Sequence, residues 1–327
     1  MGAKPKSKPA ETRGPEESAV STIPIPGVTE TAADDRPEIL ITTREDQVVN
    51  GAIRALAAED NLYQRGNVLV TVLRDSAGAV KSKFDRPAGA ARIAILPRPR
   101  LREMLAKHAR WRKSCKTRTD KIEIVDTHPP DWAVAEVEAR GEWSGIRHLE
   151  SITEAPSIRP DGSILDTPGW DEATGLLYEP NATFPKIPES PDREDARAAA
   201  QSLMFLACDF PFEGPAHEAA WLAGVLTPIA RFAINGPCPL FAIDGNSPGT
   251  GKSKLTDIAA IISTGRDMPR TAYPDNDEEM RKRITRIAAA GDRLMLLDNI
   301  ATVFGGSALD SALTASTWRD RTLANPR

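Results

Sequence analysis

Apolar residues are spaced in two ways along the chain, and the spacing predicts where helices and strands lie. Between Arg44 and Leu62 they recur every three or four positions, as on a helix with one buried face. Val68 to Leu73 and Ala91 to Leu96 are short apolar runs bounded by turn residues, and we expect strands there. Leu101 to Trp111 returns to helical spacing. Together these segments predict a small α+β module over residues 37–125.

Two stretches lack this periodicity and divide the chain. Residues 1–36 hold almost no large apolar side chain, so they cannot bury enough surface to offset the entropy of ordering, and we expect a disordered tail. Residues 126–191 begin with a short predicted helix near Trp132 and then carry seven prolines between positions 156 and 191. This density of proline excludes long helices, and we interpret the part as a Pro-rich connector of ordered loops.

Residues 192–327 open with two apolar helices, predicted at 191–208 and 215–233, and continue into a pattern with chemical meaning. Leu240 to Ile243 has the length of a strand, a loop of Gly, Ser, Pro and Thr follows, and a helical segment runs from Lys252 to Gly265. Strand, glycine-rich loop and helix are the context that a phosphate-binding loop requires. Glycine permits the tight turns that aim N–H groups at an anion, and the helix N-terminus adds partial positive charge.

This loop supplies the candidate nucleotide-binding residues. Lys252 would reach the β- and γ-phosphates of ATP, and the Ser253 hydroxyl would bind Mg²⁺. The usual pattern has glycine where this chain has Asn246, and asparagine accepts a positive φ more readily than other non-glycine residues. A chance glycine loop between a strand and a helix is the alternative. The predicted nucleotide-binding set is Asn246, Ser247, Pro248, Gly249, Thr250, Gly251, Lys252 and Ser253.

A second apolar run, residues 294–297, ends in Asp298. A strand would carry Asp298 to its carboxyl end, where ligands of open α/β sheets bind, and the carboxylate would hold Mg²⁺. The alternative is a core strand that ends in a turn aspartate. Asn299 follows, where hydrolytic P-loop proteins often have Glu; its amide orients water but cannot take a proton, so the sequence predicts binding more firmly than hydrolysis. Lys252, Asp298 and Asn299 are the candidate catalytic residues.

Charge is distributed unevenly in a chain of net charge −4. Eleven lysines and arginines lie between Arg92 and Lys121, against the two acids Glu103 and Asp120. With Trp111 as a stacking platform, this stretch predicts a nucleic-acid contact, and a solvated helix face is the alternative. The candidate nucleic-acid residues are Arg98, Arg100, Arg102, Arg110, Trp111, Arg112 and Lys113.

Cysteine content and hydropathy bear on the cellular compartment. The three cysteines lie far apart without a C-x-x-C pair, which argues against a disulfide framework and a zinc site. The longest apolar stretch, Trp221 to Ile234, is interrupted by Pro228 and Arg231 and is too short to span a bilayer. No apolar leader is visible near the N-terminus. We therefore expect a cytoplasmic protein without a membrane partner.

The two motifs resemble those of one family. The sequences D-G-N-S-P-G-T-G-K-S and L-M-L-L-D-N-I resemble the ATPase core of primase–helicase proteins from phages, plasmids and integrated mobile elements, in the AAA+ or superfamily 3 helicase group. The upstream stretch I-R-P-D-G-S-I-L-D-T-P-G-W-D-E-A-T-G-L-L-Y resembles the segment before that core. The stretch F-G-G-S-A-L-D-S-A-L-T-A-S-T-W-R-D-R after Asp298 is also similar to theirs.

The resemblance implies a DNA helicase-like ATPase that uses ATP and Mg²⁺. Such proteins hydrolyse ATP between the subunits of a homo-oligomeric ring and move along single-stranded DNA, and Arg319 or Arg321 would lie near the DNA or the neighbouring subunit. The expected fold is an α/β P-loop NTPase domain over 192–327. We expect it to be incomplete, because no sensor strand or arginine finger is recognisable before Arg327. A non-hydrolytic, ATP- and DNA-binding accessory module or truncated remnant is the open alternative.

Overall fold

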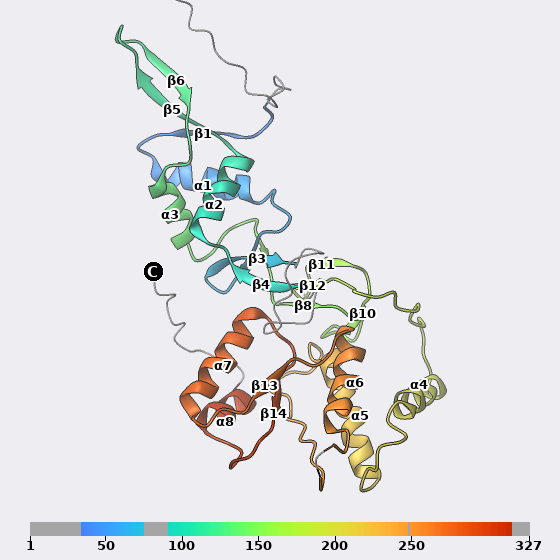
Figure 1. The fold of residues 1–327 in the computed structure, drawn as a ribbon. Helices are drawn as coiled ribbons and strands as arrows, with labels where there is room; N and C mark the ends of the chain where they lie inside the picture. Colours follow the sequence, from blue (N-terminus) through green and yellow to red (C-terminus); the bar gives the residue numbers. More distant parts are fainter. Residues whose placement is uncertain (1–33, 75–90, 248, 316–327) are drawn as a thin grey trace, which may run out of the picture. The chain divides into compact units, whose positions relative to one another are not determined.

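The computed structural model describes residues 34–74, 91–247 and 249–315. The chain divides into Met1–Asp35 and Arg36–Arg327, and the tail expected at 1–36 lies almost wholly outside the described residues. The second unit holds every described helix and strand (Figure 1). None of the described helices has both the length and the apolar content needed to cross a membrane.

Three helices pack against a three-stranded sheet in the first part of this unit. Within the sheet β1 runs parallel to β5, and β5 pairs antiparallel with β6. The core between sheet and helices includes Leu56, Leu105, Trp111 and Trp143. The elements are β1 (Glu38–Ile41), α1 (Glu45–Leu56), α2 (Arg98–His108), β5 (Arg110–Lys116), β6 (Ile122–Asp126) and α3 (Asp131–Ala139).

A four-stranded sheet, in the order β4-β3-β2-β7, joins the chain segments before and after α2. Strands β3 (Val68–Leu73) and β4 (Arg92–Ile95) confirm two predicted strands, and they pair antiparallel. Strand β2 (Tyr63–Arg65) pairs antiparallel with β3 and parallel with β7 (Arg147–His148). The α+β character predicted for this part is therefore present in the structure.

The expected division between residues 125 and 126 does not coincide with a change of hydrophobic core. Ala133, Val134 and Val137 on α3 are buried in the same cluster as α1 and α2, and so are Trp143 and Ile146. The apolar side chains of α3 complete the face that α1 and α2 leave open. The first core therefore extends to Ile146.

The segment predicted as ordered loops contains short strands. Strands β8, β11 and β12 form a three-stranded sheet, and β9 and β10 form a hairpin. Leu165, Leu176 and Tyr178 are buried together, so this part has a small core of its own. Its prolines flank the strands instead of interrupting them, so a proline-rich stretch still forms hydrogen-bonded strand pairs. The strands are β8 (Ser151–Thr153), β9 (Ser157–Ile158), β10 (Ile164–Leu165), β11 (Gly169–Asp171) and β12 (Leu176–Tyr178).

The last part of the described chain combines five helices with a parallel pair of strands. Strand β13 pairs with β14, and Ala272 lies opposite Asp298. Helix α5 packs on α6 through Trp221, Val225 and Leu255. The elements are α4 (Arg193–Phe205), α5 (Pro215–Ala230), α6 (Lys252–Thr264), β13 (Arg270–Ala272), α7 (Asp277–Ala290), β14 (Leu296–Asp298) and α8 (Ser307–Thr314).

Two local predictions here have different outcomes. Helix α6 runs from Lys252 to Thr264 and is closed by Gly265, whose φ of 70° is left-handed, as the sequence predicts. The strand predicted at Leu240–Ile243 is wrong: none of these residues is in a strand, and Leu240 and Phe241 are exposed. The sheet in which they would pair has only the strands β13 and β14 among the described residues.

Candidate nucleotide site

The loop before α6 has its conformation set by two glycines. Gly249 and Gly251 both have left-handed backbones, with φ of 80° and 87°. A side chain at Gly251 would also place its Cβ 2.7 Å from Cε1 of Phe210. Left-handed φ strains other residues, so both positions favour glycine, and at Gly251 the close ring adds a second reason.

The loop closes on its own polar groups. Lys252 Nζ donates to the Ser247 carbonyl oxygen at 3.1 Å and lies 3.5 Å from Thr250 Oγ1. Thr250 Oγ1 donates to the same carbonyl at 3.2 Å. The ammonium group of Lys252 is therefore held against oxygen atoms of the loop.

Asn246 does not play the backbone role expected of it. Among the described non-glycine residues positive φ occurs only at Asp120 and Asn299, so the idea that Asn246 supplies a left-handed turn is wrong. Its Oδ1 instead accepts a hydrogen bond from Ser247 Oγ at 3.3 Å. Gly245, one residue earlier, has little room for a side chain, because a Cβ there would lie 3.0 Å from Thr250 Oγ1 and Thr250 would have to shift.

Ser253 lies in the first turn of α6, where backbone N–H groups have no intrahelical partner. Its side-chain oxygen makes no hydrogen bond within the described residues, while its carbonyl accepts from Thr256 Oγ1 at 2.7 Å. The hydroxyl is thus available to a ligand. Pro248, the remaining member of the predicted set, lies outside the described residues.

Helix α6 is tied both to α5 and to the strand pair. Trp221 Nε1 on α5 donates to the Leu255 carbonyl at 3.3 Å. On the other side Asp257 forms an ion pair with Arg270 of β13 at 2.7 Å. Because β13 pairs with β14, these contacts link the helix that follows the loop to the strand that ends in Asp298.

Asp298 is the last residue of β14, as predicted, and it is half-buried. Its Oδ1 accepts the backbone N–H of Asn299 at 3.0 Å. Asn299 is exposed and has a left-handed φ of 56°, so the residue type suits a turn that starts directly after the strand. No hydrogen bond or ion pair within the described residues joins Asp298 to Lys252 or Ser253.

Most of the predicted nucleic-acid residues are engaged within the first part of the unit. Arg98 Nε donates to Glu138 at 2.6 Å, and Arg102 pairs with Asp131 at 3.0 Å. Arg110 pairs with Asp126 at 3.0 Å, and Arg112 pairs with Glu38 at 3.0 Å. Four of the predicted cations are therefore neutralised by acids from other segments of the chain, which a one-dimensional count of charge does not reveal.

The role proposed for Trp111 is wrong. The residue lies in β5 and not on a helix, only 2% of it is exposed, and its Nε1 donates to the Leu105 carbonyl at 3.0 Å. Its indole fills the core and is not available for stacking on a base. Arg100 and Lys113 are exposed, and their side chains have no hydrogen bond or ion pair within the described residues.

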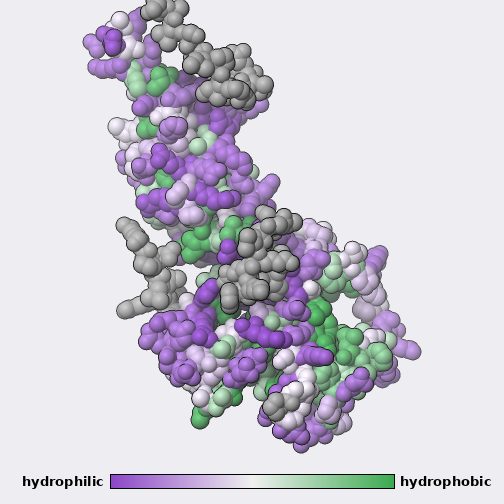
Figure 2. Space-filling view, viewed as in Figure 1, coloured by the Kyte–Doolittle hydropathy of each residue, from purple (hydrophilic) through white to green (hydrophobic). Residues whose placement is uncertain are grey.

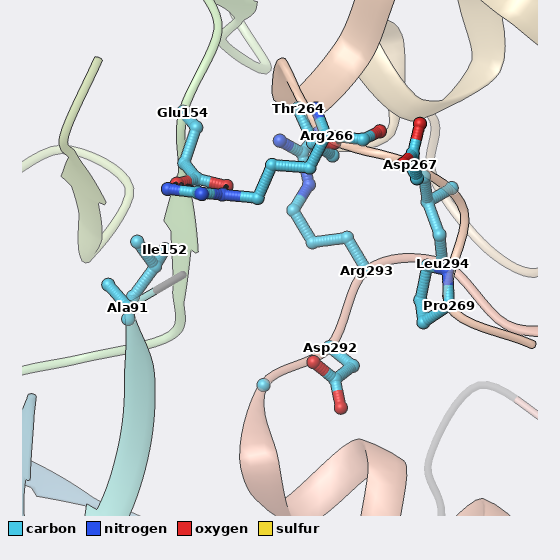
Figure 3. Close-up of a pocket in the computed structure, with 11 residues that line it drawn as sticks. Ala91, Ile152, Glu154, Thr264, Arg266, Asp267, Pro269, Asp292, Arg293 and Leu294 are labelled. Atoms are coloured by element: carbon cyan, nitrogen blue, oxygen red, sulfur yellow. Dashed lines mark hydrogen bonds and ion pairs between the residues drawn. The ribbon is translucent and has the colours of Figure 1, made fainter. Parts of the chain in front are cut away.

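A buried polar cluster that no sequence pattern indicated lies next to β14, around a cavity of about 80 Å³ (Figure 3). Arg266 and Glu154 form a largely buried ion pair at 2.6 Å. Arg293 Nη1 donates to Thr153 Oγ1 at 2.7 Å, and Arg293 Nη2 donates to the Pro228 carbonyl. Burial lowers the pKa of Arg293 to about 10, against the opposing attraction of Glu154. The cluster anchors the segment before Asp298 to β8 and α5.

Comparisons with protein-family models, with curated proteins and with solved structures found no match to this chain. The described residues also contain no group of three or more His, Cys, Asp or Glu side chains arranged to hold a metal ion.

Proposed function

We propose that this chain binds ATP with Mg²⁺ at the loop 246–253 and acts as a DNA helicase-like ATPase of a mobile genetic element. The observation that carries the proposal is the opening of α6: two left-handed glycines precede Lys252, whose ammonium group is held over the loop. Backbone N–H groups of the loop, the N-terminus of α6 and Lys252 would together supply the positive charge that a triphosphate requires.

The bound nucleotide would replace the internal hydrogen bonds of the loop. In the structure the ammonium group of Lys252 donates to an uncharged acceptor, the carbonyl oxygen of Ser247. A phosphate oxygen is a stronger acceptor for an ammonium donor than a carbonyl is, so exchange of partners favours binding. Ser253 would supply one oxygen to Mg²⁺, and Asp298 would approach the metal from the carboxyl end of β14, directly or through water.

The test of nucleotide binding is calorimetry on the full chain with ATP and Mg²⁺. We expect Lys252→Ala to weaken binding by roughly 10- to 150-fold, because a hydrogen bond to a charged group contributes about 1.5–3 kcal/mol. Lys254→Ala is the matched control, since Lys254 lies on the same helix and is exposed. Equal affinities for the two variants would contradict a phosphate-binding role for the loop.

The coupling to DNA is the second part of the proposal, and it rests on the family that the motifs resemble. Helicase-type enzymes turn over faster when single-stranded DNA is present, and they assemble as rings. We expect single-stranded DNA to stimulate phosphate release and Asp298→Asn to abolish that release while ATP affinity changes less. Tight ATP binding with no turnover on DNA would instead favour the non-hydrolytic accessory module, for which Asn299 after Asp298 is the specific argument, because an amide cannot accept a proton from water.

A further inference from the structure

We propose that the end of the β5–β6 hairpin is the nucleic-acid contact of this chain, with Lys116, Arg118 and Lys121 on backbone phosphates. The inference rests on the proposed function for the identity of the partner. It relocates the contact from the arginines of α2 and early β5, which the sequence favours, to a part of the basic stretch in which the positive charges have no acidic partner.

The difference between the two groups of cations is their pairing. The side chains of Lys113, Lys116, Arg118 and Lys121 are exposed and make no ion pair or hydrogen bond within the described residues. Within 113–121 the single acid is Asp120. A phosphate contact at these side chains therefore breaks no existing ion pair, whereas a contact at Arg98 or Arg102 would have to displace a carboxylate.

The loop that presents these cations is ordered by its own hydrogen bonds. Thr117 N donates to the Lys121 carbonyl at 2.8 Å, and Asp120 N donates to the Thr117 carbonyl at 3.0 Å. Asp120 has a left-handed φ of 59°, which closes the turn. The hydroxyls of Thr117 and Thr119 lie 3.0 Å apart. Cations on a fixed loop lose less conformational entropy on binding than cations on a flexible tail.

The hairpin also offers apolar side chains beside the charges. Lys116 lies opposite Ile122, and Ser114 lies opposite Ile124, so both isoleucines share the face of the ribbon that Lys116 occupies. Ile122 is 71% exposed and Ile124 is 44% exposed. In Figure 1 the hairpin extends beyond α1, α2 and α3, and in Figure 2 its end is mainly hydrophilic. A two-stranded ribbon fits the major groove of duplex DNA, where apolar side chains contact base edges.

The test is fluorescence anisotropy of labelled single-stranded and duplex DNA with the full chain, without nucleotide, over a series of salt concentrations. The variant is Lys116→Gln/Arg118→Gln/Lys121→Gln. The control, Lys186→Gln/Arg193→Gln/Arg197→Gln, removes the same charge from exposed positions near and on α4. We expect the hairpin variant to bind at least about tenfold more weakly than the control. We also expect its slope of log affinity against log salt to be smaller by about 2–3, since each lost phosphate contact removes about 0.9.

The separate measurements with single-stranded and with duplex DNA show which form of DNA is bound. A loss confined to duplex DNA places the ribbon in a groove, and a loss confined to single strands places it along one backbone; each outcome supports the proposal. Affinities and salt slopes equal to those of the control on both arms would overturn it. So would binding of the hairpin to phosphatidylserine vesicles in the absence of any binding to DNA, because a membrane surface would then be the partner.

A variant of the loop acid tests the sign of the effect. Asp120→Asn removes the one negative charge of the loop and keeps a residue that tolerates left-handed φ. We expect it to strengthen DNA binding by about two- to threefold at low salt; no gain, or a loss, would contradict a phosphate contact here. ATP affinity serves as the independent readout. If the hairpin variant loses affinity for DNA and keeps its affinity for ATP, the inference holds. If neither the parent chain nor any variant binds ATP, the proposed function fails, but the DNA-binding measurements still test the hairpin.

Discussion

Helices α1 and α4 are nearly equal in length and are stabilised in opposite ways. The N-cap residue of helix α1, Arg44, makes no side-chain capping bond to the helix backbone, yet the helix buries six residues. Helix α4 begins with a capping box, in which Asp192 accepts from the N–H groups of Glu194 and Asp195, yet none of its residues is buried. Helix α1 is therefore stabilised mainly by packing against neighbouring elements, and helix α4 mainly by the capping hydrogen bonds at its N-terminus.

The same contrast separates the two regions that contain these helices. Strand β3 lies inside a four-stranded sheet, and four of its six residues are buried. Strand β14 has one partner strand, and all three of its residues are half-buried. The region of the candidate site therefore depends more on local features, such as the glycines before α6 and the left-handed backbone of Asn299. Ligand-binding segments are commonly found at the less stable end of a structure.

The largest expected effect is in the first core. Trp143 is fully buried, and its Nε1 donates to the Val137 carbonyl at 2.6 Å. We expect Trp143→Ala to lower the free energy of unfolding by about 3–5 kcal/mol, through lost burial and the cavity that remains. Phe205→Ala on α4 removes a ring that is 73% exposed, and we expect a change within about 0.5 kcal/mol. Urea denaturation measures both, and similar costs would refute the contrast.

The second effect is a pH dependence that belongs to the first region. Burial tends to raise the pKa of Glu59, but hydrogen bonds from Lys107 and His108 outweigh it and lower the pKa from 4.5 to about 2. The ionised form is thus favoured in the folded state. Its stabilisation, up to about 3 kcal/mol, is fully present above pH about 4.5 and is lost as the pH falls through about 2.

Glu59→Gln should flatten the loss of stability between these two pH values, measured by denaturation at each pH. Glu278 on α7 is the matched control, because the hydrogen bond from Lys282 lowers its pKa as well, but the pair is exposed to solvent. We expect Glu278→Gln to leave the acid dependence unchanged. If both variants reduced the pH dependence of the free energy of unfolding equally, burial would not distinguish the two acids.

The third effect concerns the loop of the proposed nucleotide site. Gly251→Ala and Gly249→Ala both place a side chain on a left-handed backbone, but only the first also meets Phe210, since nothing lies within 4 Å of a Cβ at Gly249. We expect Gly251→Ala to cost about 1–2 kcal/mol more in ATP binding than Gly249→Ala. In a double-mutant cycle Phe210→Ala should recover part of this difference. If Phe210→Ala restored ATP affinity equally in Gly249→Ala, the clash with Phe210 would be excluded as the cause of the difference between the two glycine variants.

Local patterns in the sequence predicted local features well. The bounds of α6, the stop at Gly265 and the position of Asp298 at the end of a strand follow from residues within a few positions of each feature. The strand at Leu240–Ile243 was not predictable in the same way, because a strand exists only if a partner offers its backbone groups. Trp111 shows the same limit: periodicity placed it on a helix, but the helix ends at His108 and the chain turns into β5.

Charge was the least reliable guide, because ion pairing is a property of the fold. Arg112 and its partner Glu38 are separated by most of the first module in sequence, and parallel pairing of β1 with β5 brings them together. The acid that neutralises Arg98 comes from α3, which the sequence assigned to another part of the chain. A count over one window therefore overstates the free positive charge on α2 and gives no special weight to the hairpin loop.

The smallest expected effect returns to α4. Asp192→Ala removes the acceptor for two backbone N–H groups, and the loss of such a cap costs about 1 kcal/mol. Because α4 has no fully buried residue and contacts the α5–α6 cluster through the partly buried Leu203 and Met204, we expect this cost to appear as faster hydrogen exchange in 193–205 without a change in the unfolding of the first core. Arg44→Ala at the N-cap of α1 should change neither, since the Arg44 side chain makes no capping bond and loses only an exposed ion pair with Asp46 at 3.5 Å. If Asp192→Ala destabilised the whole unit, α4 would have to be coupled to the rest through contacts stronger than its exposed surface implies.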